Sequence, residues 1–280
     1  MIQWFPGHMA KTKREIKENL SIVDLVIELV DARVPASSQN PLLQEVIGNK
    51  EKIVVLMKKD LADATKTKQW LEYFKRSNIH AIAVNANDKK DISHLVDLVY
   101  QVGQAKLNRL KEKGVTAQPI RALIIGIPNV GKSTLINRLA NKKIAKIGDR
   151  PGITKQKQWI KVRGKFELLD TPGMLWPKFE SEEIGLKLAA IGTIKYELTP
   201  QQDVAAFLIQ YLLEHYPDLF LQRFPIEERE DMWIIFEEIG RQRGALESGG
   251  HVNFDKVAEI VLQDLRAGKI GRISIEEAPF

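Results

Sequence analysis

The segment that most constrains this chain is the loop Gly126-Ile127-Pro128-Asn129-Val130-Gly131-Lys132-Ser133, which lies in mid-sequence. The apolar run 121–125 before it predicts a buried strand, and the run 134–139 after it predicts a helix. A G-x-x-x-x-G-K-S loop between a strand and a helix is typical of a phosphate-binding loop (P-loop), because its backbone N–H groups and the helix N-terminus face the phosphates. The sequence therefore predicts a nucleotide-binding protein with a P-loop NTPase fold.

The side chains of this loop have separate expected roles. Lys132 is expected to reach the β and γ phosphate oxygens, and we also count it as a catalytic residue. The Ser133 hydroxyl is expected to ligate Mg²⁺. Within the loop and the first helical turn we assign nucleotide binding to Asn129, Val130, Gly131, Lys132, Ser133 and Thr134.

Composition narrows the class of protein. The chain has no cysteine, which excludes disulfides and thiolate catalysis and is typical of a reducing cytosol. It has no signal-peptide pattern and no apolar run near the roughly 20 residues of a membrane span, so we expect a cytoplasmic protein without a membrane partner. Residues 1–179 have a net charge of +15 and residues 180–280 a net charge of −9. The basic first part suggests a polyanionic partner, although lysines can also simply solvate a surface.

Apolar runs at 22–30, 53–56 and 81–84 predict strands, and helical patterns at 67–75 and 94–110 follow the last two. Strands that alternate with helices favour a mainly parallel sheet with helices on both faces. Two further strands are expected at 157–162 and 166–169. We therefore predict an α/β domain over 1–178, with a basic arm at 1–20 and a linker at 111–119.

From about Glu180 the pattern becomes helical throughout. Its clearest helix has apolar residues on one face, Asn253 as a possible N-cap and Gly268 at its end. We expect a separate helical domain over 179–280. Its arginines could form a basic face, with Arg241 and Arg243 as the first candidates, or could simply be solvated.

Three residues match the other phosphate-side loops of a GTPase. Asp170 ends a strand in Asp170-Thr171-Pro172-Gly173 and is expected to hold Mg²⁺ through water, while the Gly173 N–H would contact the γ-phosphate. Thr154, between the two loops, is the candidate switch threonine that completes Mg²⁺ coordination.

The base-recognition loop is expected at Met57-Lys58-Lys59-Asp60, after the strand 53–56. GTPases carry Asn-Lys-x-Asp there. The carboxylate of Asp60 would accept from guanine N1–H and N2–H₂, and the stem of Lys58 would cover the ring, whereas Met57 cannot hydrogen-bond as asparagine does. A second base loop is expected at Asn85 and Ala86, because they follow the next strand.

These loops occur in an unusual order. Both base loops precede the P-loop, whereas ordinary GTPases run from the P-loop to the base loops. The sequence therefore predicts a circularly permuted GTPase core, which the neighbouring termini of an α/β domain tolerate.

The whole chain resembles the bacterial circularly permuted GTPases of the YlqF type, the ribosome biogenesis GTPase A family. The resemblance rests on the segments 4–9, Asp31-Ala32-Arg33-Val34-Pro35, 40–41, the P-loop with its Pro128-Asn129, 152–154 and 170–173. It implies a GTPase that acts late in assembly of the large ribosomal subunit and is released after hydrolysis. The implied partners are GTP and GDP, ribosomal RNA and ribosomal proteins, and a monomer is the default state.

The attacking water needs an orienting group, and Met174 stands where Ras-like enzymes carry glutamine. The resemblance suggests His8 for this role; a structural or RNA-contacting His8 is the alternative. Asn129 occupies the position of the asparagine that holds K⁺ in potassium-dependent GTPases, although it could instead brace the loop.

Two other functions stay open at this point. The protein could be a GTPase that acts on another RNA, or a nucleotide-gated module that binds a protein. The acidic C-terminal part favours the second, because bulk charge does not make it an obvious RNA binder.

Overall fold

The computed structural model describes residues 17–39, 41, 47–48, 50–112, 119–141, 159–170, 181–193 and 200–279. In this described part, six strands form one sheet in the order β3-β2-β1-β4-β6-β5. The strands are β1 (Leu25–Asp31), β2 (Glu51–Met57), β3 (His80–Val84), β4 (Ile120–Gly126), β5 (Trp159–Val162) and β6 (Phe166–Asp170). Only β5 pairs antiparallel with its neighbour, so the predicted mainly parallel sheet is confirmed.

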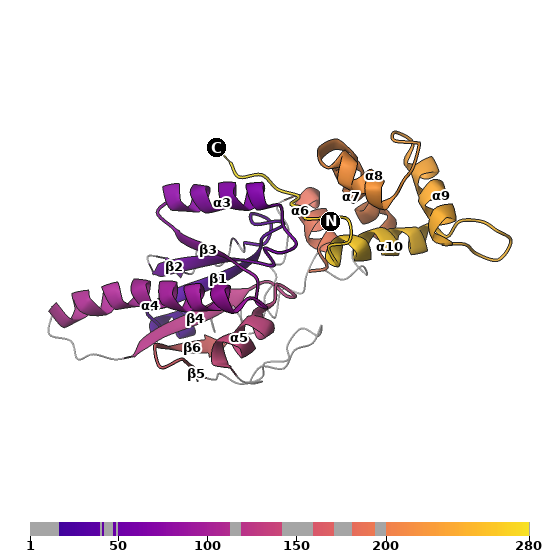
Figure 1. The fold of residues 1–280 in the computed structure, drawn as a ribbon. Helices are drawn as coiled ribbons and strands as arrows, with labels where there is room; N and C mark the ends of the chain where they lie inside the picture. Colours follow the sequence, from indigo (N-terminus) through magenta and orange to yellow (C-terminus); the bar gives the residue numbers. More distant parts are fainter. Residues whose placement is uncertain are drawn as a thin grey trace.

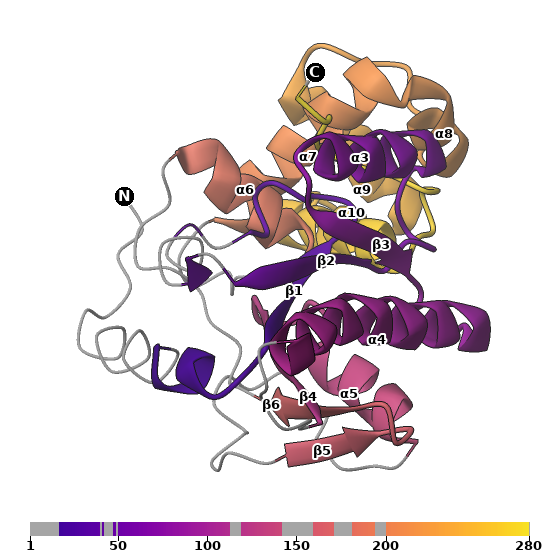
Figure 2. The same cartoon turned by 90° about the vertical axis from the view of Figure 1, so that its left-hand side faces the viewer.

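Helices cover both faces of the sheet because its central strands are apolar on both sides (Figure 2). From β1, Leu25, Ile27 and Leu29 pack in one cluster with α4 (Lys89–Glu112) and α5 (Lys132–Ala140). Val30 faces the other way and packs with Trp70 of α3 (Ala64–Arg76). This alternation fixes the register of β1, because a slip by one residue would exchange the two faces.

The order of the strands along the chain agrees with the predicted circular permutation. β2 and β3, which lead into the base loops, come before the P-loop strand β4, and all three belong to one sheet in which β4 lies beside β1. Each predicted strand end differs from the observed end by three residues or fewer. The linker prediction is wrong at its start, since α4 continues through Glu112, two residues into 111–119.

The C-terminal part contains α6 (Glu182–Ala190), α7 (Gln201–His215), α8 (Pro217–Arg223), α9 (Met232–Arg243) and α10 (Phe254–Arg266). α10 contacts α6, α7 and α9 (Figure 1). The Asn253 side chain caps α10 by accepting from Lys256 N, and Gly268 after the helix has a left-handed φ of 70°, as the sequence predicts. Among the described helices, none is long and apolar enough to cross a membrane.

The last segment differs from a purely helical domain over 179–280. After α10 the chain is not helical and runs back to the α/β part, toward α3 (Figure 1). The backbone N–H of Ile275 donates to Arg33 O at 2.8 Å, and the Trp70 Nε1 of α3 donates to Glu276 O at 3.4 Å. The C-terminal residues therefore belong to the surface of the sheet domain.

Candidate nucleotide-binding site

The loops singled out in the sequence meet at one edge of the sheet. The partners Asp31↔Met57 and Met57↔Val84 place the ends of β1, β2 and β3 level with one another. Leu29↔Gly126 and Ile124↔Asp170 bring the ends of β4 and β6 to the same edge. Ligands of open α/β sheets bind at the carboxyl ends of the strands. The described loops after β2, β3 and β4 and the end of β6 therefore form one candidate site.

The P-loop has the backbone geometry that the motif requires. Asn129 and Gly131 have left-handed φ values of 58° and 103°, and Gly131 is the N-cap of α5. Lys132 opens the helix, with Ser133 and Thr134 half-buried behind it in its first turn. Lys132 Nζ lies 2.5 Å from Asp170 Oδ1, and both side chains are buried. The structure thus brings the P-loop lysine and the aspartate of β6 to one point.

Asn129 has a partner outside the α/β part. Its Nδ2 donates to Gly192 O at 3.0 Å, just after α6. Arg266 of α10 lies over the same turn and donates from Nε to Ala190 O at 2.9 Å and from Nη2 to Ala189 O at 2.6 Å. The P-loop is therefore joined to the helical part by a direct hydrogen bond.

The base loop carries its two key residues in different environments. Lys58 has a left-handed φ of 59°, and its Nζ lies 3.1 Å from Asp31 Oδ2. Asp60 is exposed at the turn that follows. Met57 is buried, and its Cε lies 3.3 Å from the position that a Cβ on Gly131 would take. Methionine therefore packs against the P-loop where other GTPases place asparagine.

A further carboxylate, which sequence reasoning missed, ties the two base loops together. Asp91 in the first turn of α4 accepts from Lys59 Nζ at 2.5 Å and from Asn85 N at 2.8 Å. Asn85 and Ala86 are half-buried beside it. An aspartate near a helix start was the available signal, but such residues commonly only cap helices.

The pair Asp31–Arg33 was visible in the sequence without an assigned role. Arg33 Nε and Nη2 donate to the Asp31 carboxylate, each at 2.8 Å, and both residues are buried. Burial alone raises the pKa of Asp31, but the Arg33 guanidinium and the Lys58 ammonium hold the pKa of this carboxyl well below its usual range. Asp31 therefore stays ionised, and its carboxylate anchors the Lys58 ammonium of the base loop.

The comparisons with known proteins identify the family to which the chain belongs. The family model for the 50S ribosome-binding GTPase matches residues 121–238. Ribosome biogenesis GTPase A from Priestia megaterium is 51% identical over 278 residues, which is 99% of this chain and 96% of the relative. The protein of the same name from Thermotoga maritima is 32% identical, over 98% of this chain and 94% of the relative.

The chain belongs to the ribosome biogenesis GTPase A family. A GNP-bound YlqF from T. maritima has the same fold, with 29% identity and a TM-score of 0.69 over 96% of this chain and 98% of that one. A GDP-bound YlqF from that organism gives a TM-score of 0.68 at the same identity, over 94% of this chain and 99% of that one. The chain is therefore a circularly permuted GTPase of the YlqF type, and membership implies a divalent metal ion, usually Mg²⁺.

Three predicted site residues lie outside the described residues: His8, Thr154 and Gly173. The assignments that the described residues bring together are those of the P-loop, Asp170 and the two base loops.

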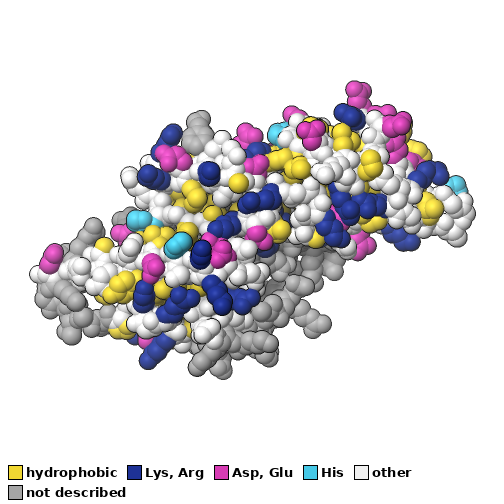
Figure 3. All heavy atoms as spheres, in the orientation of Figure 1, with side chains coloured by type: hydrophobic (Ala, Val, Ile, Leu, Met, Phe, Trp, Pro, Cys, Tyr) yellow, Lys and Arg dark blue, Asp and Glu magenta, His cyan; other side chains and the backbone are white. Residues whose placement is uncertain are grey.

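Several described arginines of the helical part, the candidates for a basic face, have carboxylate or backbone partners. Arg223 pairs with Asp264 at 2.6 Å, and Arg243 Nη2 donates to Arg223 O at 2.7 Å. Arg241 lies 3.1 Å from Glu237. Figure 3 shows acidic side chains along the upper edge of this part and Lys and Arg side chains gathered below them. Arg223 and Arg243 therefore help to hold the helical part together, whereas Arg241 is exposed on α9.

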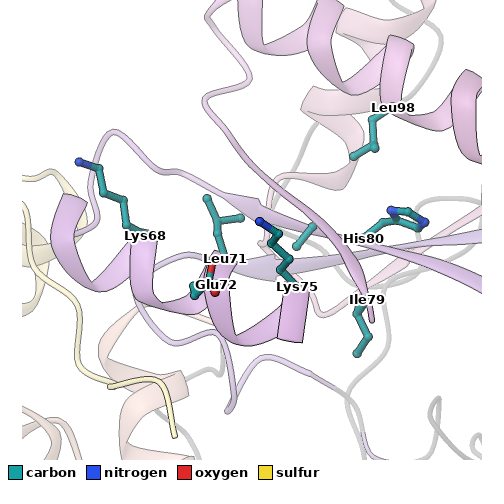
Figure 4. Close-up of a pocket in the computed structure, with 8 residues that line it drawn as sticks. Lys68, Leu71, Glu72, Lys75, Ile79, His80 and Leu98 are labelled. Atoms are coloured by element: carbon teal, nitrogen blue, oxygen red, sulfur yellow. The ribbon is translucent and has the colours of Figure 1, made fainter. Parts of the chain in front are cut away.

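A shallow hollow lies elsewhere on the GTPase, at the start of β3. Figure 4 shows Lys68, Leu71 and Lys75 of α3 on one side, with His80 and Leu98 opposite. His80 is the first residue of β3, whereas the base loop follows the last, Val84. The hollow is therefore at the other end of the strand and is not part of the nucleotide site.

Proposed function

We propose that this GTPase binds the immature large ribosomal subunit, promotes a late maturation step and is released after GTP hydrolysis. The observation that carries the proposal is the match to the 50S ribosome-binding GTPase family. The name shared by relatives along 99% of the chain supports an action in ribosome biogenesis. The net charge of +15 on residues 1–179 supports a polyanionic partner such as ribosomal RNA. A cytoplasmic monomer fits this role.

The nucleotide would lie across the edge described above. Lys132, with the backbone of Asn129, Val130 and Gly131 and the start of α5 at Ser133 and Thr134, would hold the phosphates. On the other side Lys58 and Asp60 would recognise guanine, with Asn85 and Ala86 beside the base. Asp60 is exposed, so its carboxylate is accessible to the guanine edge. Thr154 and Gly173 would complete the γ-phosphate side.

The donors at the P-loop fit a magnesium ion. The Ser133 hydroxyl would supply a hard oxygen, the ligand class that Mg²⁺ prefers, and Thr154 would supply another, while the Asp170 carboxylate would hold the ion through water. When bound, the ion would neutralise charge on the phosphates. The Lys132 ammonium would add its own positive charge near the phosphate oxygens. Its Nζ lies 2.5 Å from Asp170 Oδ1, so it is close to the proposed ion site.

Potassium is the second proposed ion. Because Asn129 Nδ2 donates to Gly192 O, the Oδ1 of the same amide is the atom that could coordinate a cation. A cation there would act as an arginine finger does, by neutralising charge that develops during phosphoryl transfer.

His8 is the proposed group that orients the attacking water, since Met174 cannot do so. The expected result for His8→Ala is intact GTP binding with loss of ribosome-stimulated turnover. Unchanged stimulated turnover would assign the orienting role to another group.

We propose two domains: residues 1–178 bind and hydrolyse GTP, and residues 179–280 bind the ribosome. The first possibility is that residues 179–280 contact ribosomal RNA. A protein partner is the other, because the arginines of the helical part are mostly paired and its net charge is −9. Steep salt dependence of ribosome binding would favour RNA.

The test is GTP turnover in K⁺ buffer, with and without large ribosomal subunits. A stimulation of tenfold or more, about 1.4 kcal/mol off the barrier, is the expected result. Small subunits at equal concentration are the control. No stimulation with GTP binding intact would favour another RNA or a protein partner instead.

A further inference from the structure

The segment Arg272–Glu276, here called the C-terminal strap, lies directly on the base loop. Ile273 N donates to Leu61 O at 3.0 Å, on the residue after Asp60. Arg272 donates from Nη2 to Lys59 O at 2.8 Å and from Nε to Ala62 O at 3.0 Å. Three backbone carbonyls of the segment 59–62 are therefore held from the C-terminal end of the chain.

The strap continues onto the loop that follows β1. Ile275 N donates to Arg33 O at 2.8 Å, and the Glu276 carboxylate accepts from Ala36 N at 2.7 Å and from the Ser37 hydroxyl. Ile273, Ser274 and Ile275 are almost fully buried. The strap is therefore packed into the α/β part and is not a loose terminus.

The helical part holds the strap from the other side. Tyr211 and Tyr216, at α7 and α8, donate to Ser274 O at 3.2 and 3.1 Å. On the side of the α/β part, Ser274 Oγ accepts from the backbone N–H of Asp63, the N-cap of α3, at 3.1 Å. A Cβ on Gly268 would lie 2.8 Å from Leu61 Cδ2, so the turn after α10 also packs closely on the base loop.

We propose that the C-terminal strap, chiefly through Arg272, positions the loop that carries Lys58 and Asp60 for guanine recognition. Lys58 is in a left-handed conformation, which costs a non-glycine residue free energy unless its surroundings hold it. Inside the α/β part this loop is held by Lys58–Asp31, Lys59–Asp91 and the bond from Lys59 N to Val84 O at 3.4 Å. The strap holds Lys59 O just before Asp60 and the carbonyls of Leu61 and Ala62 just after it, so it fixes the backbone on both sides of the Asp60 carboxylate.

Arg272 is thus a positioning residue, and this inference rests on the proposed assignment of Lys58 and Asp60 to the base. It also predicts a reciprocal effect, because a partner that shifts the helical part would change guanine affinity through the same contacts.

The test compares the affinities of GDP and IDP by isothermal titration calorimetry on the full chain. IDP lacks the 2-amino group from which Asp60 would accept, so the GDP/IDP affinity ratio reports the position of the carboxylate. Arg272→Ala is expected to weaken GDP binding about tenfold and to lower this ratio several-fold. Arg272→Lys can reach only one carbonyl and should fall between. Ser274→Ala, a milder change, should shift the ratio in the same direction.

Arg241→Ala is the matched control, because Arg241 is also an exposed arginine of the C-terminal part but, among the residues that the structure describes, pairs with Glu237 on its own helix. It should leave both affinities unchanged. Asp60→Ala separates the two proposals. If Asp60→Ala brings the GDP/IDP affinity ratio close to one while the Arg272 and Ser274 variants keep the wild-type ratio, the strap proposal is wrong and guanine recognition by Asp60 stands. If Asp60→Ala keeps the ratio, base recognition by Asp60 is wrong and the strap proposal falls with it.

Discussion

Asn129 Nδ2 donates to Gly192 O at 3.0 Å, which joins the P-loop to the turn after α6. The donor lies in the loop proposed to hold the phosphates, and Arg266 of α10 lies over the acceptor's turn. A change in the P-loop can therefore be transmitted to the helical part without passing through the sheet.

Asn129→Ala tests the role of this amide. The hydrogen bond is exposed, so its loss should cost no more than about 1 kcal/mol of unfolding free energy. If Oδ1 also coordinates K⁺, the variant should lose the advantage of K⁺ over Na⁺ in GTP turnover. Asn108→Ala is the control, because Asn108 is an exposed amide on α4 with a partner on its own helix. Equal rates of the wild type in K⁺ and Na⁺ would count against the ion.

Asp31→Asn is expected to destabilise the fold by about 3–5 kcal/mol. The change leaves the Arg33 guanidinium buried with an uncompensated charge, and Arg33 Nη1 already has no hydrogen-bond partner in the described part of the chain. Urea unfolding measures the effect. Glu72→Gln breaks the exposed pair with Arg76 and should change stability by less than about 1 kcal/mol. Similar losses for the two variants would show that burial does not set the cost.

The same carboxylate predicts an acid dependence of stability. The pKa of Asp31 is lowered in the folded chain, so its contribution is present above the unfolded pKa of about 3.9 and is lost as the pH falls below it. Unfolding free energy should therefore fall less steeply below pH 4 in Asp31→Asn than in the wild type. Parallel curves for the two proteins would contradict the assignment.

Met57→Asn restores the residue that other GTPases carry, and we expect it to harm this one. The buried thioether packs against Gly131, so asparagine would lose that contact and bury an amide, at a cost of about 2 kcal/mol or more. Met57→Leu conserves volume and should cost less than about 1.5 kcal/mol. Thermal unfolding and GDP affinity check both. An asparagine variant that is stable and binds GDP more tightly would show that a polar partner lies within reach.

The fold and the P-loop could be predicted because their signals are local. Apolar runs such as 53–56 give strands, and a glycine followed by Lys132 and Ser133 gives the P-loop. Asn253 and Gly268 gave the ends of α10 in the same way. These features depend on neighbours a few residues away.

The missing parts of the site depend on distant pairs. Asn129 and Gly192 are 63 residues apart, and Arg272 and Lys59 are 213 apart. An isolated arginine carries no signal of the partner that it will meet, so the pairing of Arg223 with Asp264 could not be predicted. The alternation of Ile273, Ser274 and Ile275 was the only local sign of an extended segment.

The position of β1 at the centre of the sheet has a consequence for synthesis on the ribosome. Residues 25–84 contain the three strands of the base side, and β1 pairs with β2 on one edge and with β4 on the other. During synthesis, which proceeds from the N-terminus, that second edge stays unpaired until residues 120–126 have emerged. An apolar edge strand without a partner is prone to pair with other chains. In the permuted order, the strands that lead into the base loops are therefore made first, and the P-loop strand β4 must later pair with the free edge of β1. Until it does so, the growing chain is exposed to aggregation.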